Sequence, residues 1–222
     1  MRSSSARPKR SDFGLCLAAL AVLLTAADAP DEATKALDGV QKRYDSVRDM
    51  RASFVQTSFS AALGKETEAH GTVLVKRPGK MRWEYAEPDG RVIVLDGEAI
   101  KIWNPQDKQL QIAKLSASNV SPTALGFLMG QGVLRDTFDA KPASEPGRTD
   151  KGLLLHPKGD AGFESLLLWL DPKTSELRES VVVDLFGNKT RLKLESIVEN
   201  GGVDAKAFEL ATPPGAEVID LR

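Results

Sequence analysis

The hydrophobic positions of this chain follow two different periods, and the change falls near residue 51. Between residues 31 and 48 the apolar side chains recur every three or four residues, at Leu37, Val40, Tyr44 and Val47. This spacing predicts an amphipathic helix. Asp31 and Glu32 suit its N-terminal end, where the helix dipole is positive. The apolar stripe of such a helix must pack on another element.

From residue 51 onward, apolar and polar residues alternate with a period of two, which is typical of half-buried β-strands. Turn residues such as glycine, proline and aspartate separate the runs. The predicted strands are 52–59, 72–76, 81–85, 92–95, 100–103, 109–113, 152–156, 163–170, 177–186, 190–197 and 208–210. So many strands with turns between them predict one large, strongly curved antiparallel sheet.

Residues 121–132 depart from this alternation and form a second helical candidate. Pro122 suits the first turn of a helix, and the glycines at positions 126, 130 and 132 allow a short helix to bend or end. A helix inserted between strands is well placed to cover an open end of the sheet. Residues 141–151 contain two prolines and five charged residues and are predicted to form a solvent loop.

The first 27 residues have the layout of a secretory signal peptide. Four basic residues precede an apolar stretch at 13–24, and small residues follow it. A membrane-spanning helix needs about 20 apolar residues, so export followed by cleavage is favoured. Cleavage after Ala27 leaves residues 28–222 as the mature chain, whereas a cut after Ala29 would place Pro30 directly behind the cleaved bond.

The single cysteine, Cys16, lies in this apolar stretch. Leu15 precedes it where a lipoprotein signal has a small residue, so lipid attachment is not predicted. Cleavage leaves a mature chain without a thiol, and it changes the formal charge from −1 to −4 because it removes four basic and one acidic residue. A weakly acidic chain of this length predicts one domain and disfavours nucleic acid or an anionic membrane surface as partners.

No catalytic or metal-binding constellation is evident along the chain. His70 and His156 stand apart in the sequence, and structural or solvent roles suit them better than catalysis or metal ligation. Asp96, Asp171 and Asp184 stand next to glycine, proline or a strand end and are predicted to be turn residues. No glycine-rich phosphate loop, His-Glu-x-x-His or Gly-x-Ser-x-Gly motif occurs. We therefore expect no enzyme activity, no cofactor and no metal.

A series of short motifs is more informative together than any of them alone. An Arg77-Pro78 turn, an Arg82-Trp83-Glu84-Tyr85 strand, an Asp96-Gly97 turn and a Trp103-Asn104-Pro105 strand end follow one another. The later motifs are Asp184-Leu185-Phe186-Gly187-Asn188-Lys189-Thr190, Phe208, Pro213-Pro214-Gly215 and Val218-Ile219-Asp220. In their order and spacing the chain resembles the periplasmic lipoprotein carrier family, LolA, over nearly the whole mature sequence.

The resemblance implies a mainly β fold with helices: an incomplete antiparallel β-barrel that is covered by a helical lid and encloses a hydrophobic cavity. It implies a periplasmic chaperone that binds the acyl chains of lipoproteins released from the inner membrane and delivers them to the outer membrane. The implied partners are acylated lipoproteins, an ABC-type release complex in the inner membrane and an outer-membrane lipoprotein acceptor. Such a carrier is expected to be a monomer.

Strand alternation indicates which side chains share a face with this cavity. Met81, Trp83 and Tyr85 alternate with Arg82 and Glu84, so the first three point to one side of the sheet. Patterning alone also allows an ordinary filled core, and the resemblance favours a cavity. The residues expected to line it are Tyr44, Val47, Met81, Trp83, Ile100, Ile102, Leu125, Phe127, Leu128, Leu192 and Leu194.

By the same resemblance, Arg77 corresponds to the arginine that holds the lid of these carriers closed. A guanidinium has five fixed donors, which suit the carbonyl groups at the end of a lid helix. Without the resemblance, Arg77 would be interpreted as an edge-strand residue in water.

Two related functions are alternatives. The outer-membrane acceptor family LolB shares the fold, but it is lipid-anchored and exposes a hydrophobic residue on a loop between strands. The equivalent turn here, 86–91, is polar, and the lipidation signal fails. The other alternative is a periplasmic lipid-binding or sensor module of the same fold, and a signalling or sensor role would need a further domain or a transmembrane partner segment. Lipoprotein, free lipid and glycolipid all remain candidate cargoes.

Overall fold

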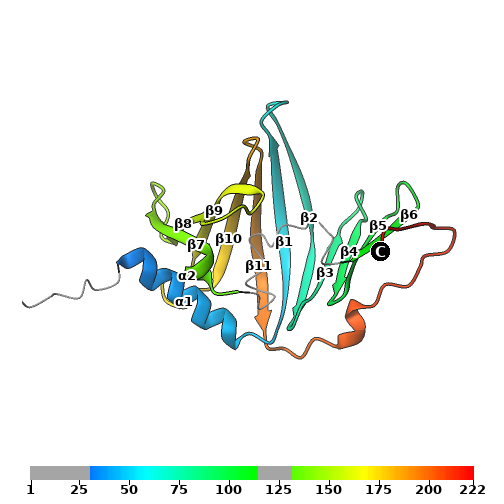
Figure 1. Cartoon of the computed structure of the whole chain (residues 1–222), viewed down its shortest axis with the longest axis horizontal. Coiled ribbons are helices and arrows are strands. Elements are labelled where there is room, and N and C mark those ends of the chain that lie inside the picture. The colour runs from blue at the N-terminus through cyan, green and yellow to red at the C-terminus, as the bar shows by residue number, and fades with distance from the viewer. Residues whose placement is uncertain (1–30, 115–131) are drawn as a thin grey trace, which may run out of the picture.

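The computed structural model describes residues 31–114 and 132–222 (Figure 1). Over these residues the chain forms one 12-stranded sheet with three helices. The helices are α1 (Glu32–Ser46), the short α2 (Leu134–Thr137) and a 3-10 helix, η1 (Ala205–Phe208). The strands are β1 (Asp49–Ser60), β2 (Lys65–Lys76), β3 (Lys80–Tyr85), β4 (Val92–Asp96), β5 (Ala99–Asn104), β6 (Gln109–Lys114), β7 (Phe138–Ala143), β8 (Lys151–Pro157), β9 (Phe163–Leu170), β10 (Leu177–Asp184), β11 (Lys189–Glu199) and β12 (Glu217–Asp220).

The sheet is open and almost entirely antiparallel. Its strand order is β12-β6-β5-β4-β3-β2-β1-β11-β10-β9-β8-β7. Only the β12–β6 pair is parallel among the described strand pairs. Because β7 and β12 form separate edges, the sheet does not close over these residues. The predicted mainly β fold is confirmed at this level, and an open sheet is consistent with an incomplete barrel.

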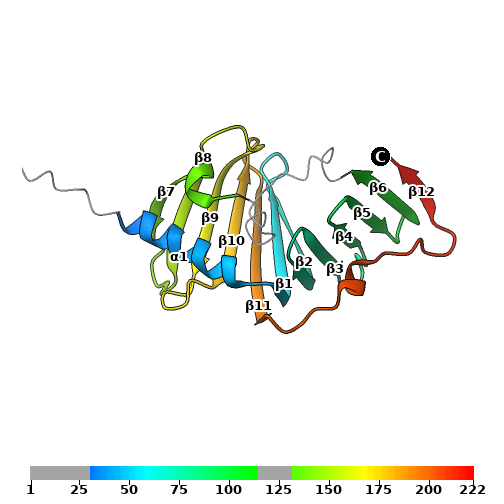
Figure 2. The ribbon, with the colours of Figure 1, turned by 60° about the horizontal axis from the view of Figure 1, so that its bottom comes forward.

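Helix α1 forms where the sequence predicts it and lies across one half of the sheet. Asp31 caps its N-terminus, because its carboxylate accepts a hydrogen bond of 2.6 Å from the backbone N–H of Thr34. The helix crosses the half of the sheet built from β7–β10 (Figures 1 and 2). Its buried residues are Ala33, Ala36, Leu37, Val40 and Tyr44. The apolar stripe of the helix therefore supplies one wall of the core.

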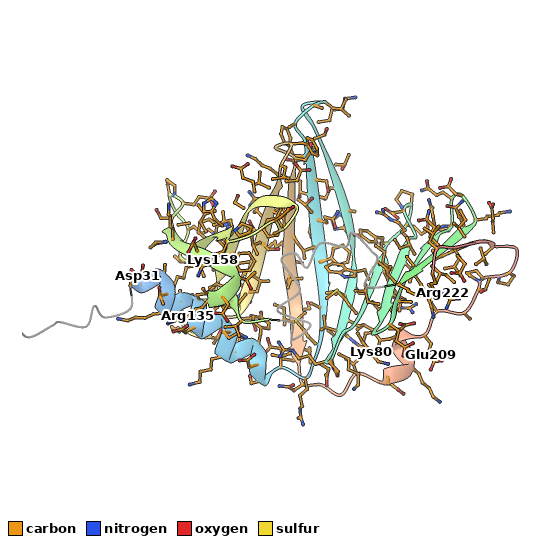
Figure 3. The ribbon with its side chains drawn as sticks, in the orientation of Figure 1. Asp31, Lys80, Arg135, Lys158, Glu209 and Arg222 are labelled. Atoms are coloured by element: carbon orange, nitrogen blue, oxygen red, sulfur yellow. The ribbon has the colours of Figure 1, made fainter. Side chains whose placement is uncertain are left out.

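The N-terminal end of α1 is also fixed by charged groups. Asp31, Arg135 and Lys158 are labelled at this end in Figure 3. Arg135 pairs with Asp38 on the helix, and the Lys158 ammonium donates a hydrogen bond of 2.7 Å to the backbone carbonyl of Arg135. These contacts connect α1 with α2 and the loop after β8.

We call the face of the sheet on which α1 packs the inner face, and the opposite one the outer face. Apolar residues of both halves of the sheet meet in one cluster on the inner face. Its buried strand residues include Met50, Phe54, Val73, Val75, Met81, Leu95, Ile100, Leu153, Leu155, Leu166, Leu168, Leu192 and Leu194. The helix packs on the β7–β10 half, and within the described residues no helix packs on the other half of this apolar face.

The C-terminal segment packs on the outer face and forms a smaller core there. Phe208 and Val203 are buried against Val94 of β4. Arg82 donates hydrogen bonds to the backbone carbonyls of Ala207 and Glu209. The segment then runs past β4 and β5 to β12 (Figure 2), and Figure 3 shows Glu209 close to Lys80 of β3, with which it lines a shallow pocket.

Several predicted boundaries are wrong, each for a local reason. The predicted strand 208–210 is not a strand: Phe208 ends η1, whose N-cap is Asp204, and residues 209–210 follow without regular secondary structure. The predicted loop 141–151 belongs partly to β7 and β8, and its proline Pro142 is accommodated because β7 is an edge strand. The predicted strand 177–186 ends at Asp184, because the chain turns there. Strand β12 was not predicted.

Three sequence predictions concern segments outside the described residues. These are the signal peptide at 1–27, the helix at 121–132 except for its last residue, and the cavity residues Leu125, Phe127 and Leu128. They stay predictions. Within the described parts of the chain, no helix is both long and apolar enough to span a membrane.

Candidate functional site

The strands β2–β5 carry two parallel rows of apolar side chains on the inner face. Directly opposed residues in neighbouring strands share a face, so the register identifies the members of each row. One row is Val75, Met81, Leu95 and Ile100, and the next is Val73, Trp83, Ile93 and Ile102. Four of the predicted cavity residues thus lie side by side. They lie on β3 and β5, and short turns connect these strands through β4.

The third row is aromatic and joins this half of the sheet to β11. Phe54 of β1 lies opposite Leu194 on one side and Gly71 on the other, and Gly71 lies opposite Tyr85. The Phe54 ring packs edge-to-face on Trp83, with centroids 4.9 Å apart, and on Tyr85 at 5.2 Å. These three aromatic rings form the centre of the inner face.

Phe54 and Gly71 were missing from the predicted site. A Cβ atom on Gly71 would lie 2.1 Å from the backbone oxygen of Glu84 and 2.7 Å from the Phe54 ring. Only glycine therefore allows Phe54 to lie across β2 at this point. The signal in the sequence was a glycine directly before the predicted strand 72–76; that it lies opposite Phe54 follows only from the register of β1 and β2.

Beyond the aromatic rings the inner face becomes polar. Gln56 and Ser58 continue the alternation of β1, with Thr67 and Thr190 opposite Ser58 on either side. The Tyr85 hydroxyl donates a hydrogen bond of 3.0 Å to the Gln56 side-chain oxygen, and the Gln56 amide donates one of 3.2 Å to the Ser58 hydroxyl. The face thus passes from apolar near α1 to polar near the turns that join β1 to β2 and β10 to β11.

Tyr85 occupies the boundary between these two regions. The Arg91 guanidinium lies over its ring, 4.6 Å from the centroid. Burial raises the pKa of the Tyr85 hydroxyl, which therefore stays protonated and able to donate. An amphipathic ligand with an apolar and a polar part would match this gradient.

Tyr44 and Val47 close the α1 side of the inner face. The Tyr44 hydroxyl accepts a hydrogen bond of 2.9 Å from the backbone N–H of Leu177 at the start of β10. Its side chain is 1% exposed, and burial raises the pKa of the hydroxyl to about 12. Val47 is the C-cap residue of α1 and is buried as well. Tyr44 therefore anchors the helix on the sheet.

The structure brings together the predicted cavity residues that it describes. All eight belong to the inner-face cluster, where six are buried and Trp83 and Ile102 are partly buried against them. The eight are Tyr44, Val47, Met81, Trp83, Ile100, Ile102, Leu192 and Leu194. Their role as lining residues of a cavity stays a prediction.

Arg77 lies between β2 and β3, beside the C-terminal end of α1. Its backbone N–H donates a hydrogen bond of 2.8 Å to the Arg48 carbonyl, and its guanidinium lies 3.9 Å from the Asp45 carboxylate. The side chain is 17% exposed, less than a side chain extended into water would be. Burial lowers the pKa of the guanidinium, and Asp45 acts in the opposite direction.

The titratable residues give no sign of a catalytic or metal centre in the described parts of the chain. No group of three or more histidine, cysteine, aspartate or glutamate side chains is arranged there to hold a metal ion. His70 is an exposed neighbour of Glu68. Asp96, Asp171 and Asp184 accept backbone hydrogen bonds within turns, as predicted.

Comparison with known proteins identifies the family. Residues 45–211 match the family described as "Outer membrane lipoprotein carrier protein LolA". The chain belongs to the LolA family. The matched region contains Arg77 and the predicted cavity residues with the exception of Tyr44, which directly precedes it.

Relatives in other bacteria agree over most of the chain. The outer-membrane lipoprotein carrier protein of Dechloromonas aromatica is 32% identical over 185 residues, which is 83% of this chain and 87% of that protein. The protein of the same name from Hahella chejuensis is 32% identical over 188 residues, covering 83% and 86%.

A solved structure of an uncharacterized conserved protein from Thermus thermophilus matches the fold. Its TM-score is 0.54 at 16% identity, and the match covers 86% of this chain and 99% of that one. At this identity the likeness concerns the fold alone. The structural comparison therefore supports the fold of the sheet independently of sequence motifs.

Proposed function

We propose that this protein is a periplasmic lipoprotein carrier that binds acyl chains on the inner face of its sheet. The observation that carries the proposal is the half of that face on which none of the described helices packs, where two apolar rows and three aromatic rings lie beyond the part occupied by α1. Membership of the LolA family supplies the class of cargo. The polar side chains that follow, Gln56 and Ser58, suit the ester and peptide groups of a lipoprotein.

The energetics explain why such cargo needs a carrier. Exposure of each methylene group to water costs about 0.8 kcal/mol, so a chain of about sixteen carbons costs on the order of 12 kcal/mol. Free passage through an aqueous compartment is therefore excluded. Trp83, Met81, Ile100 and Ile102 offer the apolar surface that offsets this cost when the acyl chain lies on them.

A helical lid would complete the cavity in this proposal. Leu125, Phe127 and Leu128 would cover the acyl chains, and Arg77 would hold the closed lid through its guanidinium. A lid that closes again on the empty inner face competes with the cargo, and this competition allows release. The carrier would take lipoproteins from an ABC-type complex in the inner membrane and pass them to an acceptor in the outer membrane.

Acyl binding can be followed through Trp83 alone. The chain has three tryptophans, at positions 83, 103 and 169, so Trp103→Phe with Trp169→Phe leaves Trp83 as the only one. We expect a palmitoylated lipopeptide to change its fluorescence. The matched control keeps Trp103 instead, which lies on the outer face opposite Val92, and should not respond. Absence of binding by a protein whose circular dichroism shows the folded state would contradict the proposal.

Export is tested on the protein from its native periplasm. Intact-mass measurement should find an unlipidated chain that begins near residue 28, because Cys16 belongs to the predicted signal peptide. A diacylated or membrane-retained product would instead favour an acceptor of the LolB type.

A further inference from the structure

Two hairpin turns lie side by side at one end of the sheet. Residues 61–64 connect β1 to β2, and residues 185–188 connect β10 to β11. The backbone N–H of Ala61 donates a hydrogen bond of 3.0 Å to the Asn188 side chain, which joins the two turns. They project together at the end of the long central strands, away from α1 (Figure 1). We call these two turns the tip.

The tip exposes three large apolar side chains. Leu63 is 72% exposed, Leu185 65% and Phe186 85%. Single apolar residues on a surface are ordinary, but three on two adjoining turns form a patch. Both turns are ordered by hydrogen bonds: the Asp184 carboxylate accepts bonds of 2.8 Å from the Phe186 N–H and 2.9 Å from the Asn188 N–H, and the Gly64 N–H donates one of 2.9 Å to the Ser60 carbonyl. Their exposure is therefore a property of a structured turn.

Charged residues flank the tip but do not lie in its turns, and they are of both signs, since Asp184 precedes the second turn and Glu66 follows Lys65. Neither 61–64 nor 185–188 contains a charged residue. Lys65 and Lys189 come directly after the two turns, and both are exposed. A lysine at this position can keep its apolar stem beside the inserted residues while its ammonium group reaches the phosphate layer.

We propose that the tip docks the protein on a lipid bilayer by inserting Leu63, Leu185 and Phe186 at the boundary between headgroups and acyl chains. A protein partner fits the patch less well. An aromatic side chain buries at most about 250 Å², so three side chains supply far less than the 1,200–2,000 Å² that is typical of a stable protein interface. A bilayer needs no complementary shape and accepts a small convex tip.

Docking by the tip also orients the inner face. Gln56 and Ser58 lie on β1 between Phe54 and the turn at 61–64, so the polar end of the inner face is the end nearest the bilayer. This goes beyond the proposed function, because it concerns where the protein docks rather than what it binds. The mature chain is acidic overall, so attraction comes from apolar insertion and should persist at high salt.

The test measures partition of the exported, processed protein onto vesicles of phosphatidylethanolamine and phosphatidylglycerol in a 3:1 ratio. The tip variant combines Leu63→Ser, Leu185→Ser and Phe186→Ser. The matched control combines Val198→Ser and Leu221→Ser, which are exposed apolar residues elsewhere, at 54% and 65%. We expect the tip variant to lose at least about tenfold in partition and the control to match the unmodified protein.

A second measurement reports the tip directly. Because residues 31–222 contain no cysteine, Phe186→Cys provides a single labelling site for a polarity-sensitive dye. Its emission should shift to the blue with vesicles in 0.5 M salt, whereas a dye at Val198→Cys should not shift. Equal partition of the tip variant, no shift at position 186, or a defect confined to transfer between proteins would overturn the proposal. Acyl-probe binding by the tip variant should be unchanged, which separates this inference from the proposed function.

Discussion

At the residue scale, the inner face depends on one glycine. Phe54 can lie against both Trp83 and Tyr85 because Gly71 leaves room between β1 and β3. Gly71→Ala should lower the free energy of unfolding by about 1–3 kcal/mol, since the added methyl group meets the Glu84 carbonyl and the Phe54 ring.

Chemical denaturation measures this loss, with Gly159→Ala as its control. A Cβ at Gly159 would meet no atom within 4 Å, so that variant should retain its stability. A reduced near-ultraviolet circular dichroism signal in Gly71→Ala would show that the aromatic rings have moved. If both glycine variants were equally stable, the assigned role of Gly71 would be wrong.

Tyr44 offers a second test at the residue scale. Its hydroxyl contributes a hydrogen bond at neutral pH and becomes destabilising when it ionises at high pH. Tyr44→Phe keeps the ring but removes the acceptor for the Leu177 N–H, which should cost about 1–3 kcal/mol at neutral pH. The pKa of Tyr44 is raised from 10.0 to about 12 in the folded state. Its contribution is therefore complete below pH 10 and is lost as the pH rises from 10 to 12, by about 2–3 kcal/mol. The free energy of unfolding, measured by denaturation at several pH values over this interval, should therefore fall less with pH for Tyr44→Phe than for the unmodified protein.

At the element scale, the sequence predicts those helices and strands that are determined by residues close to one another along the chain. The three-and-four spacing located α1, and the period of two placed Met81 and Trp83 on one face. It could not show that β1 pairs with β11, because that register joins Phe54 to Leu194 across most of the chain. Hence Phe54 was missing from the predicted site although its own strand was predicted.

The C-terminal elements escaped prediction for a different reason. Phe208 has the apolar character of a strand residue, but the Asp204 cap starts a 3-10 helix, and Phe208 is buried on the outer face. Strand β12 has only four residues and exists through parallel pairing with β6, far away in sequence. Neither element is long enough to show a periodic pattern of apolar residues in the sequence.

The turn between β2 and β3 carries the prediction for Arg77. If its guanidinium holds the lid closed, Arg77→Leu should load lipoprotein normally but transfer it to an acceptor about ten to a hundred times more slowly. The lost charge-assisted hydrogen bonds, worth about 1.5–3 kcal/mol, no longer favour the closed state that competes with acyl chains. The assay is transfer from purified, loaded carrier to acceptor.

Two variants complete that experiment. Arg77→Lys keeps the charge but not the fixed fork of donors, so transfer should remain slow. Arg51→Leu removes an exposed arginine from β1 and should transfer at the unmodified rate. Equal rates for Arg77→Leu and Arg51→Leu would leave the lid without its proposed latch.

At the scale of the whole molecule, the two faces of the sheet are packed differently, and the proposed binding concerns only the inner one. The C-terminal segment closes the outer face around Phe208, while α1 covers only part of the inner face. Phe208→Ala should therefore lower the free energy of unfolding by about 3–5 kcal/mol through the cavity it creates. Its affinity for an acyl probe, measured well below the unfolding transition, should not change.

Trp83→Ala should instead weaken acyl binding strongly and lower the stability of the protein less than Phe208→Ala does. Trp83 is only partly buried, so its removal costs less stability than the removal of Phe208, but it deletes the largest apolar surface of the predicted site. We expect at least a tenfold loss of acyl affinity, on the order of 1.4 kcal/mol. Because the two residues lie on opposite faces, their effects on stability should add in the double variant. If Phe208→Ala weakened acyl binding as much as Trp83→Ala in folded protein, binding would depend on the sheet as a whole and not on its inner face.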